Sequence, residues 1–349
     1  MIPTLVVVAV IAFAASFLGT RLLVQVLRAR AILDHPNERS SHAAPTPVGG
    51  GLVVIGVIGA EGLVVWGLSG VMRHGDFGLA VPLIVALAAA LGVMSWRDDR
   101  RPLSPAVRLG VQALVVAAGL IALSAGGHVF QGILPAWLDL ALTAFLWLWL
   151  INLTNFMDGI DGISGVEGAA IGIGVMLLAP FAGAASVAFG AGHADVLALL
   201  GIIVAAAMAG FLYFNWQPAQ IFLGDVGAVP LGLLFGWLLF ELAGAGLWVA
   251  ALLLPLYYVM DATLTLMRRI ARRERIMQAH RSHFYQRAAR RLGSHARVSS
   301  IVLALNAVLV ALAYASALQP AHQIAALATG VVLTTAVLWY FAPDAAPKP

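Results

Sequence analysis

Uncharged apolar runs of about 20 residues recur along the whole chain, and this feature constrains the fold most. A helix needs about 20 such residues to cross roughly 30 Å of hydrocarbon. The chain has 349 residues, of which 61% are hydrophobic and 10% charged, far from the balance of a soluble domain. The pattern predicts an all-α, polytopic integral membrane protein with 10–11 transmembrane helices. The predicted spans are 3–27, 49–72, 77–95, 107–126, 134–151, 164–187, 194–214, 227–245, 247–267, 298–318 and 322–342.

The polar segments between these runs are too short to form a separate globular domain. The first run has no basic segment before it, which favours a retained first helix over a cleaved signal peptide. Cysteine is absent, which excludes disulfides and thiolate metal sites. We expect a single transmembrane catalytic domain over 1–349, with cytoplasmic loops near 28–48, 96–106, 152–163, 215–226 and 268–297.

Basic residues are distributed unequally between the two sets of loops. Of the 20 lysines and arginines, only Arg73 falls in an even-numbered loop, which leaves 19 on the other side. The positive-inside rule makes the arginine-rich side cytoplasmic and places the N-terminus outside. The unusual polar stretches fall on the same side, at 34–42, 98–99, 152–161, 215–225 and 280–287. Such clustering predicts a site built from several helix ends that face the cytoplasm.

The stretch NLTNFMDGIDGISG carries a polar residue at every third position, namely Asn152, Asn155, Asp158 and Asp161. On a helix, a step of three residues turns the side chain by about 60°, so all four would share one half of the surface. They are therefore predicted to face one cavity. A polar Asp-Gly turn between two helices is the alternative interpretation.

Asp225 stands where the eighth span should begin, at the end of the sequence FLGD. A carboxylate at the edge of the bilayer is costly unless it binds a cation or pairs. With Asp158 or Asp161, it would supply the hard oxygen ligands that Mg²⁺ prefers. The alternative is that Asp225 caps the following helix.

Two adjacent carboxylates, Asp98 and Asp99, follow the third span and are surrounded by arginines. Such a cluster is usually a solvated salt-bridge patch, but its position on the polar side favours a role in the site. Arg108 follows in the same loop and is a candidate for binding phosphate.

The stretch HRSHFYQRA contributes His280, Arg281 and His283 within a strongly basic segment. Cationic side chains here would bind the phosphates of a nucleotide. Contact with anionic lipid headgroups is the alternative, and two histidines without acidic neighbours do not indicate a zinc site.

Taken in order, these motifs resemble the polyprenyl-phosphate N-acetylhexosamine-1-phosphate transferases, polytopic bacterial enzymes that start cell-envelope glycan assembly on a lipid carrier. The resemblance covers nearly the whole chain. It rests on DHPNERSSHAAPTPVGGG at 34–51, on Asp98-Asp99, on 152–162, on the FLGD segment and on 280–286.

The resemblance implies a reaction in which undecaprenyl phosphate and a UDP-sugar give an undecaprenyl-diphospho-sugar and UMP. It makes Asp225 a ligand of Mg²⁺, with Mn²⁺ as a substitute, and places Asp98 and Asp99 near the lipid phosphate and the metal. Asn152, Asn155, Asp158 and Asp161 would line the nucleotide-sugar site, and His280 with its neighbours would contact the phosphates. It further implies a bacterial inner membrane protein with a cytoplasmic site, membrane lipids as partners and no nucleic acid, and it leaves a homodimer open.

Two positions depart from the family pattern. Val48 stands where many relatives have a basic residue, and Ala228 stands where a serine often follows. The histidines are also more widely spaced than in the peptidoglycan branch, which favours an amino-sugar donor such as UDP-GlcNAc for O-antigen or a related glycan.

Three other functions stay open as alternatives. One is the phospho-MurNAc-pentapeptide transferase of peptidoglycan synthesis. A second is an intramembrane aspartyl protease, although the sequence Phe222-Leu223-Gly224-Asp225 lacks the first glycine of that motif. The third is a secondary transporter, which would place polar residues near the middle of the bilayer.

Overall fold

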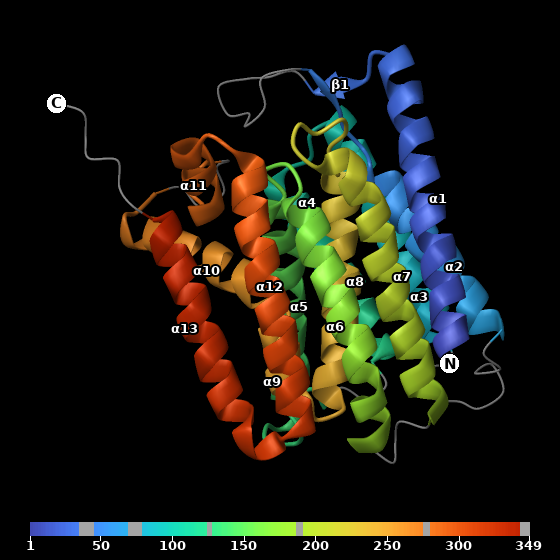
Figure 1. Cartoon of the computed structure of the whole chain (residues 1–349), viewed down its shortest axis with the longest axis vertical. Coiled ribbons are helices and arrows are strands. Elements are labelled where there is room, and N and C mark those ends of the chain that lie inside the picture. The colour runs from blue at the N-terminus through green and yellow to red at the C-terminus, as the bar shows by residue number, and fades with distance from the viewer. Residues whose placement is uncertain (35–44, 69–78, 124–127, 186–190, 275–279, 343–349) are drawn as a thin grey trace.

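The computed structural model describes the chain except for residues 35–44, 69–78, 124–127, 186–190, 275–279 and 343–349. Nearly all of the described chain is helical (Figure 1). The elements are α1 (Ile2–Ala29), β1 (Leu33–Asp34), β2 (Thr46–Pro47), α2 (Gly51–Leu68), α3 (Ala80–Arg100), α4 (Pro105–Gly119), η2 (Leu120–Ala122), α5 (Ala136–Met157), α6 (Ile163–Ala185), α7 (Ala191–Asn215), α8 (Asp225–Gly244), α9 (Trp248–Leu253), α10 (Leu256–Ala271), α11 (Phe284–Leu292), α12 (His295–Leu318), η3 (Pro320–His322) and α13 (Gln323–Phe341).

Ten of the described helices are long and apolar enough to cross a membrane. This confirms the predicted all-α polytopic membrane protein. The predicted span 247–267 is wrong in one respect, because the structure divides it into α9 and α10 around Leu254 and Pro255. A proline ring lacks the backbone N–H and clashes with the preceding turn, which accounts for the break. The orientation of the N-terminus stays a prediction.

Helix α8 is the centre of the bundle, and every residue from Val226 to Ala243 is buried. It packs against α2, α3, α5, α6 and α9, whereas α1 and α13 lie at opposite edges (Figure 1). The indole of Trp147 on α5 donates to the carbonyl of Leu233 on α8 at 2.9 Å. The helix that begins with Asp225 is therefore held on all sides.

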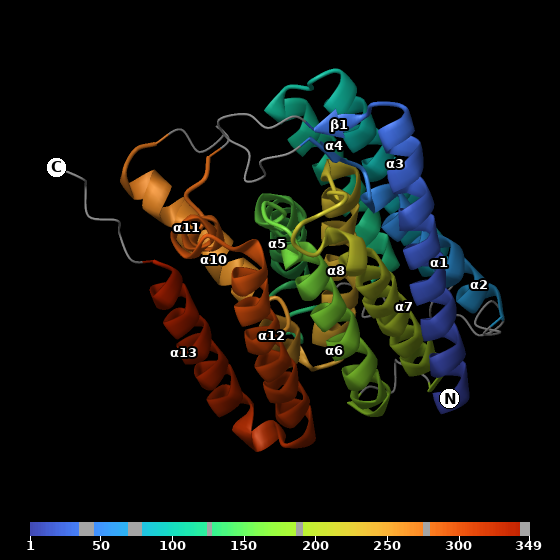
Figure 2. The ribbon, with the colours of Figure 1, turned by 45° about the horizontal axis from the view of Figure 1, so that its top comes forward.

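One end of the bundle gathers the segments that were predicted to form the site. The β1–β2 ladder and α11 both lie at this end (Figure 1). Figure 2 shows that α5 lies between α10 and α11 on one side and α3 and α4 on the other. Arg287 and Arg291 of α11 donate to the carbonyls of Ala342 and Tyr340, so the end of α13 is fixed here too.

The segment Val48–Gly51 packs against the FLGD segment and is hydrogen-bonded to it through the backbone. The backbone N–H groups of Gly49 and Gly50 donate to the carbonyl of Phe222, and that of Gly51 donates to Leu223. A Cβ on Gly51 would lie 2.1 Å from the Cα of Gly227, so only glycine allows the two backbones to approach so closely. The three glycines thus serve to position the start of α8.

Gly51→Ala is therefore expected to destabilise the protein by about 1–3 kcal/mol or to displace the start of α8, because backbone cannot move aside easily. Thermal unfolding in detergent measures the effect. Gly56→Ala on the same helix is the matched control, since a Cβ there meets nothing within 4 Å. Equal melting temperatures for the two variants would contradict the close packing of α2 on α8.

Three buried carboxylates outside this end of the bundle are all paired. Glu167 accepts from the Asn306 amide at 2.7 Å, and Glu241 lies 3.2 Å from Nε2 of His193. Asp139 accepts from the backbone N–H groups of two loop residues before α5. Each of these pairs joins two segments of the chain, which gives the carboxylates a structural role.

Candidate active site

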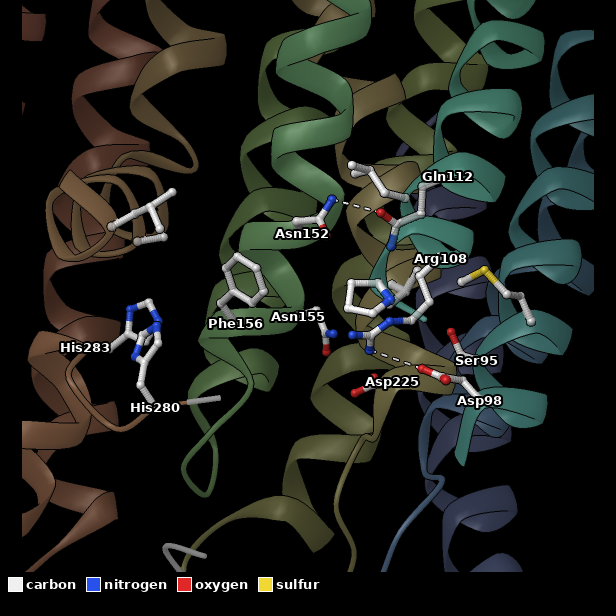
Figure 3. A pocket seen from close by; sticks show the side chains of 16 residues that line it. Ser95, Asp98, Arg108, Gln112, Asn152, Asn155, Phe156, Asp225, His280 and His283 are labelled. Carbon is white, nitrogen blue, oxygen red and sulfur yellow. Dashed lines mark hydrogen bonds and ion pairs between the residues drawn. The ribbon is translucent and has the colours of Figure 1, made fainter. Parts of the chain in front are cut away.

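A cavity of about 350 Å³ lies at the polar end of the bundle, between α3, α4, α5, α8 and α10. Figure 3 shows how the side chains surround it. Its polar lining consists of Ser95, Asp98, Arg108, Gln112, Asn152, Asn155, Asp225, His280 and His283. Its apolar lining consists of Met94, Pro105, Leu109, Phe156, Val229, Ala262 and Leu266. The structure thus brings together seven of the residues predicted from the sequence: Asp98, Arg108, Asn152, Asn155, Asp225, His280 and His283.

The turn between α3 and α4 fixes one wall of this cavity. The hydroxyl of Ser104 caps α4, and Oδ1 of Asp98 accepts from the backbone N–H of Leu103 at 2.6 Å. Oδ2 of Asp98 pairs with Nη1 of Arg108 at 3.1 Å, and the two side chains are 12% and 39% exposed. An ion pair is therefore present, as the salt-bridge interpretation held, but it faces the cavity (Figure 3).

The polar repeat on α5 is helical only in part. Asn152 and Asn155 lie one turn apart and both line the cavity, and the amide of Asn152 donates to Gln112 of α4 at 2.9 Å. The prediction that all four polar residues share one helix is wrong, because α5 ends at Met157. The glycines that follow favour a turn, and Gly162 has a φ of 83°.

Asp225 is the carboxylate that connects the acidic groups. It is the first residue of α8 and is partly buried. Its charge interacts with those of Asp98, Asp99 and Asp158, and also with the guanidinium of Arg108. Asp99 does not line the cavity itself. Several ionised carboxylates that lie close together in a partly buried region raise the free energy of the folded protein unless a cation binds between them.

Asp158 caps the end of α5 beside this group. Its Oδ1 accepts from the hydroxyl of Ser164 at 2.6 Å, and the Tyr258 hydroxyl donates to Ser164 at 3.3 Å. Burial raises the pKa of Asp158 to about 6; the Ser164 hydrogen bond opposes this shift, and the charge of Asp225 adds to it. A cation bound between the two carboxylates would favour the ionised form.

Among the described residues, no group of three or more His, Asp or Glu side chains is arranged to hold a metal ion. This does not conflict with Mg²⁺, which often takes only one or two carboxylates and completes its shell with waters and substrate phosphates. Asp225 lines the cavity, and Asp158 lies outside its lining but interacts with Asp225 through its charge, so the two would provide such a pair of hard oxygen ligands. The residues therefore fit a magnesium ion shared with a phosphorylated substrate.

Asp161 is buried and does not line the cavity. Its Oδ1 lies 3.1 Å from Nδ1 of His295, and its Oδ2 accepts from the backbone N–H of Ala219 at 3.1 Å. Its own carbonyl accepts from the Ser299 hydroxyl at 2.8 Å. The predicted catalytic role stays a prediction, but these contacts describe a residue that joins the turn after α5 to α12 and the loop before α8.

Asp161→Asn is expected to lower the free energy of unfolding by about 1–3 kcal/mol, because the pair with His295 loses its charge and one acceptor is lost. Thermal unfolding of the purified variant measures this. A variant that keeps full thermal stability yet loses all catalytic activity would support a role in chemistry instead.

The two predicted histidines lie together on the α10–α11 side of the cavity, with Phe156 between them and Asn155 in the view of Figure 3. Their rings stack with centroids 4.9 Å apart, and His280 also contacts the Ser282 hydroxyl at 2.8 Å. Arg281 does not line the cavity, and its carbonyl accepts from Arg290. Its predicted role in substrate binding stays a prediction.

The sequence analysis did not identify Gln112, which lines the cavity, or Asp261, whose carboxylate contacts the ring of His283. Gln112 lies inside the predicted apolar span 107–126, and Asp261 is the only charged residue of the predicted span 247–267. Polar residues within the membrane are expensive and often functional, so this was the available signal.

The fold and the cavity define a polytopic membrane protein with a carboxylate-rich site at one end of its helix bundle. Residues 81–243 match the model of glycosyl transferase family 4. This match confirms, for residues 81–243, the family predicted from the motifs, and the curated relatives below agree with it.

Curated relatives of two kinds match the chain. The chain is 27% identical over 319 residues to a probable undecaprenyl-phosphate N-acetylglucosaminyl 1-phosphate transferase of Bacillus subtilis, which covers 85% of this chain and 81% of the relative. It is 30% identical over 228 residues to the decaprenyl-phosphate N-acetylglucosaminephosphotransferase of Mycolicibacterium smegmatis, covering 61% of this chain and 54% of the relative. It is 28% identical over 250 residues to the phospho-N-acetylmuramoyl-pentapeptide-transferase of Shouchella clausii, covering 66% and 72%.

Proposed function

We propose that the protein transfers an N-acetylated amino-sugar 1-phosphate from a UDP-sugar to undecaprenyl phosphate and releases UMP. The observation that carries this proposal is the pair Asp98 and Asp225 beside Arg108, in a cavity that also has an apolar lining. The charges of Asp99 and Asp158 interact with that of Asp225 from outside this lining. Two anionic phosphates and a lipid chain would need such a mixed site. The substrates named for the Bacillus and mycobacterial relatives support the same reaction.

In the proposed reaction, an oxygen of the lipid phosphate attacks the phosphorus that bears the sugar. The bond from that phosphorus to the bridging oxygen breaks, and UMP leaves with the bonding electrons. A phosphate monoester has a second pKa near 6, so the attacking group is largely dianionic at pH 7 and needs no strong base. The main task of the protein is to position the groups and neutralise their charge.

The cavity side chains match these tasks. Asp98 holds the guanidinium of Arg108 toward the cavity, where it would bind a phosphate oxygen. The amides of Asn152 and Asn155 would hydrogen-bond the nucleotide sugar. The apolar side chains of α4, α8 and α10 would contact the first units of the prenyl chain.

We propose that Asp225 and Asp158 hold Mg²⁺, with Mn²⁺ as a substitute. A divalent cation in this place would neutralise the charge on the diphosphate. Asp98 and Asp99 would stay near the attacking phosphate, as positioning groups and not as covalent nucleophiles.

The proposal includes an active site on the cytoplasmic face of a bacterial inner membrane, and the O-antigen or a related envelope glycan as the pathway. The asymmetric arginines support the orientation. A homodimer is left open. The pentapeptide transferase is the second candidate, because a relative of that name matches two thirds of the chain.

The test is incubation of the purified protein with undecaprenyl phosphate, Mg²⁺ and, separately, UDP-GlcNAc, other UDP-amino sugars and UDP-MurNAc-pentapeptide. We expect UMP and a lipid-linked sugar phosphate with an amino-sugar donor, identified by mass. Turnover of the pentapeptide donor alone would favour the second candidate. Absence of UMP with every donor would refute the reaction and leave the transporter and protease alternatives.

A further inference from the structure

Asp261 lies on α10 behind the cavity, and its side chain is completely buried. Its two oxygens accept from the backbone N–H groups of Phe284 and Tyr285, each at 3.0 Å. The hydroxyls of Tyr257 and Thr265 approach the same carboxylate at 3.2 and 3.3 Å. These contacts place the carboxylate at the N-terminus of α11, where two N–H groups and the helix dipole stabilise its charge.

The same carboxylate also holds a histidine ring of the cavity. Nδ1 of His283 lies 3.2 Å from Oδ1 of Asp261, the oxygen that also accepts from Phe284. The side chain of His283 is only 5% exposed, and its ring stacks with the rings of His280 and Tyr285. A single carboxylate oxygen therefore sets both the start of α11 and the orientation of the ring.

The identity of the acceptor decides which ring nitrogen carries the proton. An ionised carboxylate only accepts hydrogen bonds, so Nδ1 of His283 must donate. Nε2 is then the atom left for another partner, and within the described part of the chain it has no hydrogen-bond partner. Because His283 lines the cavity, Nε2 is available to a ligand there.

We propose that Asp261 is a positioning residue that holds His283 with Nδ1–H toward itself and Nε2 toward the cavity, where Nε2 hydrogen-bonds the bound sugar nucleotide. This inference rests on the proposed function for the identity of the ligand. This role also accounts for the carboxylate of Asp261 within the largely apolar span 247–267. A residue that only capped α11 would not need a contact with a histidine ring on the cavity wall.

The proton position is measured directly by NMR of the ¹⁵N-histidine-labelled protein in detergent. The chain has nine histidines, so His283→Gln identifies the His283 signals by their loss. We expect a protonated Nδ1 whose signal changes in Asp261→Asn. A neutral ring in the native protein with its proton on Nε2 and a bare Nδ1 would overturn the proposal.

Kinetics then test whether Asp261 acts through the histidine. Asp261→Asn is expected to lower kcat/KM for the UDP-sugar about 10- to 100-fold, mainly through KM, which is the range seen when a carboxylate that orients a metal-binding histidine is removed. Thr265→Val is the matched control, because it removes another hydrogen bond to the same carboxylate but keeps its charge and its contact with His283. We expect little change in that variant.

A double substitution tests whether Asp261 acts through His283: Asp261→Asn is introduced both into the native protein and into the His283→Ala variant, and KM is compared. If Asp261 acts through His283, the second substitution adds no further increase in KM. The same fold-loss in both backgrounds would overturn the proposal and assign Asp261 to the fold alone. If the native protein releases no UMP, the proposed function fails, whereas the NMR measurement still decides the Asp261–His283 contact.

Discussion

Replacing Asp225 by Asn is expected to lower the rate of UMP release by at least about 10³-fold, the largest effect of any single substitution considered. Asp225 interacts with three other acidic groups and with Arg108, so it is the common point of the site. The amide keeps the size of the side chain but removes the charge that would hold a divalent cation. The measurement is UMP release as a function of Mg²⁺ concentration.

Asp195→Asn is the control for this variant. It makes the same chemical change in an exposed carboxylate near the start of α7. Both variants should fold, which thermal unfolding checks. Normal turnover by Asp225→Asn would remove Asp225 from the metal site and leave it as an acidic residue in the first turn of α8. The alternative that it caps this helix is wrong, because Gly224 is the N-cap and no side chain caps the helix.

Replacing Asp158 by Asn is expected to lower turnover by about 10²–10³-fold. The Ser164 hydroxyl donates to Asp158, which fixes the side chain, whereas burial and the charge of Asp225 raise its pKa to about 6. The ionised form of this carboxylate therefore gains most from a bound cation. We expect a higher Mg²⁺ concentration for half-maximal activity as well as a lower kcat. Asp161→Asn provides the contrast, because it should reduce stability more than activity.

An Asp158→Asn variant with unchanged kcat and unchanged Mg²⁺ dependence would contradict a metal role for this residue. In that case, its hydrogen bond with Ser164 would be a link between α5 and α6 only. The activities of Asp158→Asn and Asp161→Asn are measured at one temperature well below their unfolding temperatures. A loss of activity under these conditions reflects the reaction and not unfolding of the variant.

Most of the transmembrane architecture could be predicted from the sequence, because span length and apolar composition follow directly from bilayer thickness. The break at Pro255 is the main difference. The run 247–267 is apolar enough to cross, yet it contains the proline that ends α9 and the carboxylate that faces α11. Composition alone does not reveal that such a run is divided.

The membership of the site could be predicted in part. The distribution of arginines predicted that the polar stretches lie on one side of the membrane. The structure brings Asp98, Asn155 and Asp225, which come from three of these stretches, to one cavity. The roles of Asp158 and Asp161 could not be separated by spacing, because their environments depend on distant segments. Asp161 pairs with His295, which is 134 residues away along the chain, and only tertiary packing creates that contact.

The protease and transporter alternatives differ from the proposed function in the position of the polar site and in the residues they would need beside the carboxylates. A protease dyad would not use Arg108 or the two asparagines of the cavity wall. A transporter would place its polar site near the middle of the bilayer. The cavity instead lies at one end of the bundle, because most of its polar lining comes from the C-terminal ends of α3 and α5 and the N-terminal ends of α4 and α8. The buried Glu167 and Glu241 are each already paired.

The most direct test of the central claim follows the two phosphates of a UDP-sugar that carries different labels at each. The proposed attack at the sugar-bearing phosphorus sends that phosphate into the lipid product and leaves the other in UMP. Recovery of both labels in water-soluble UDP, with the bare sugar on the lipid, would contradict transfer of a sugar 1-phosphate.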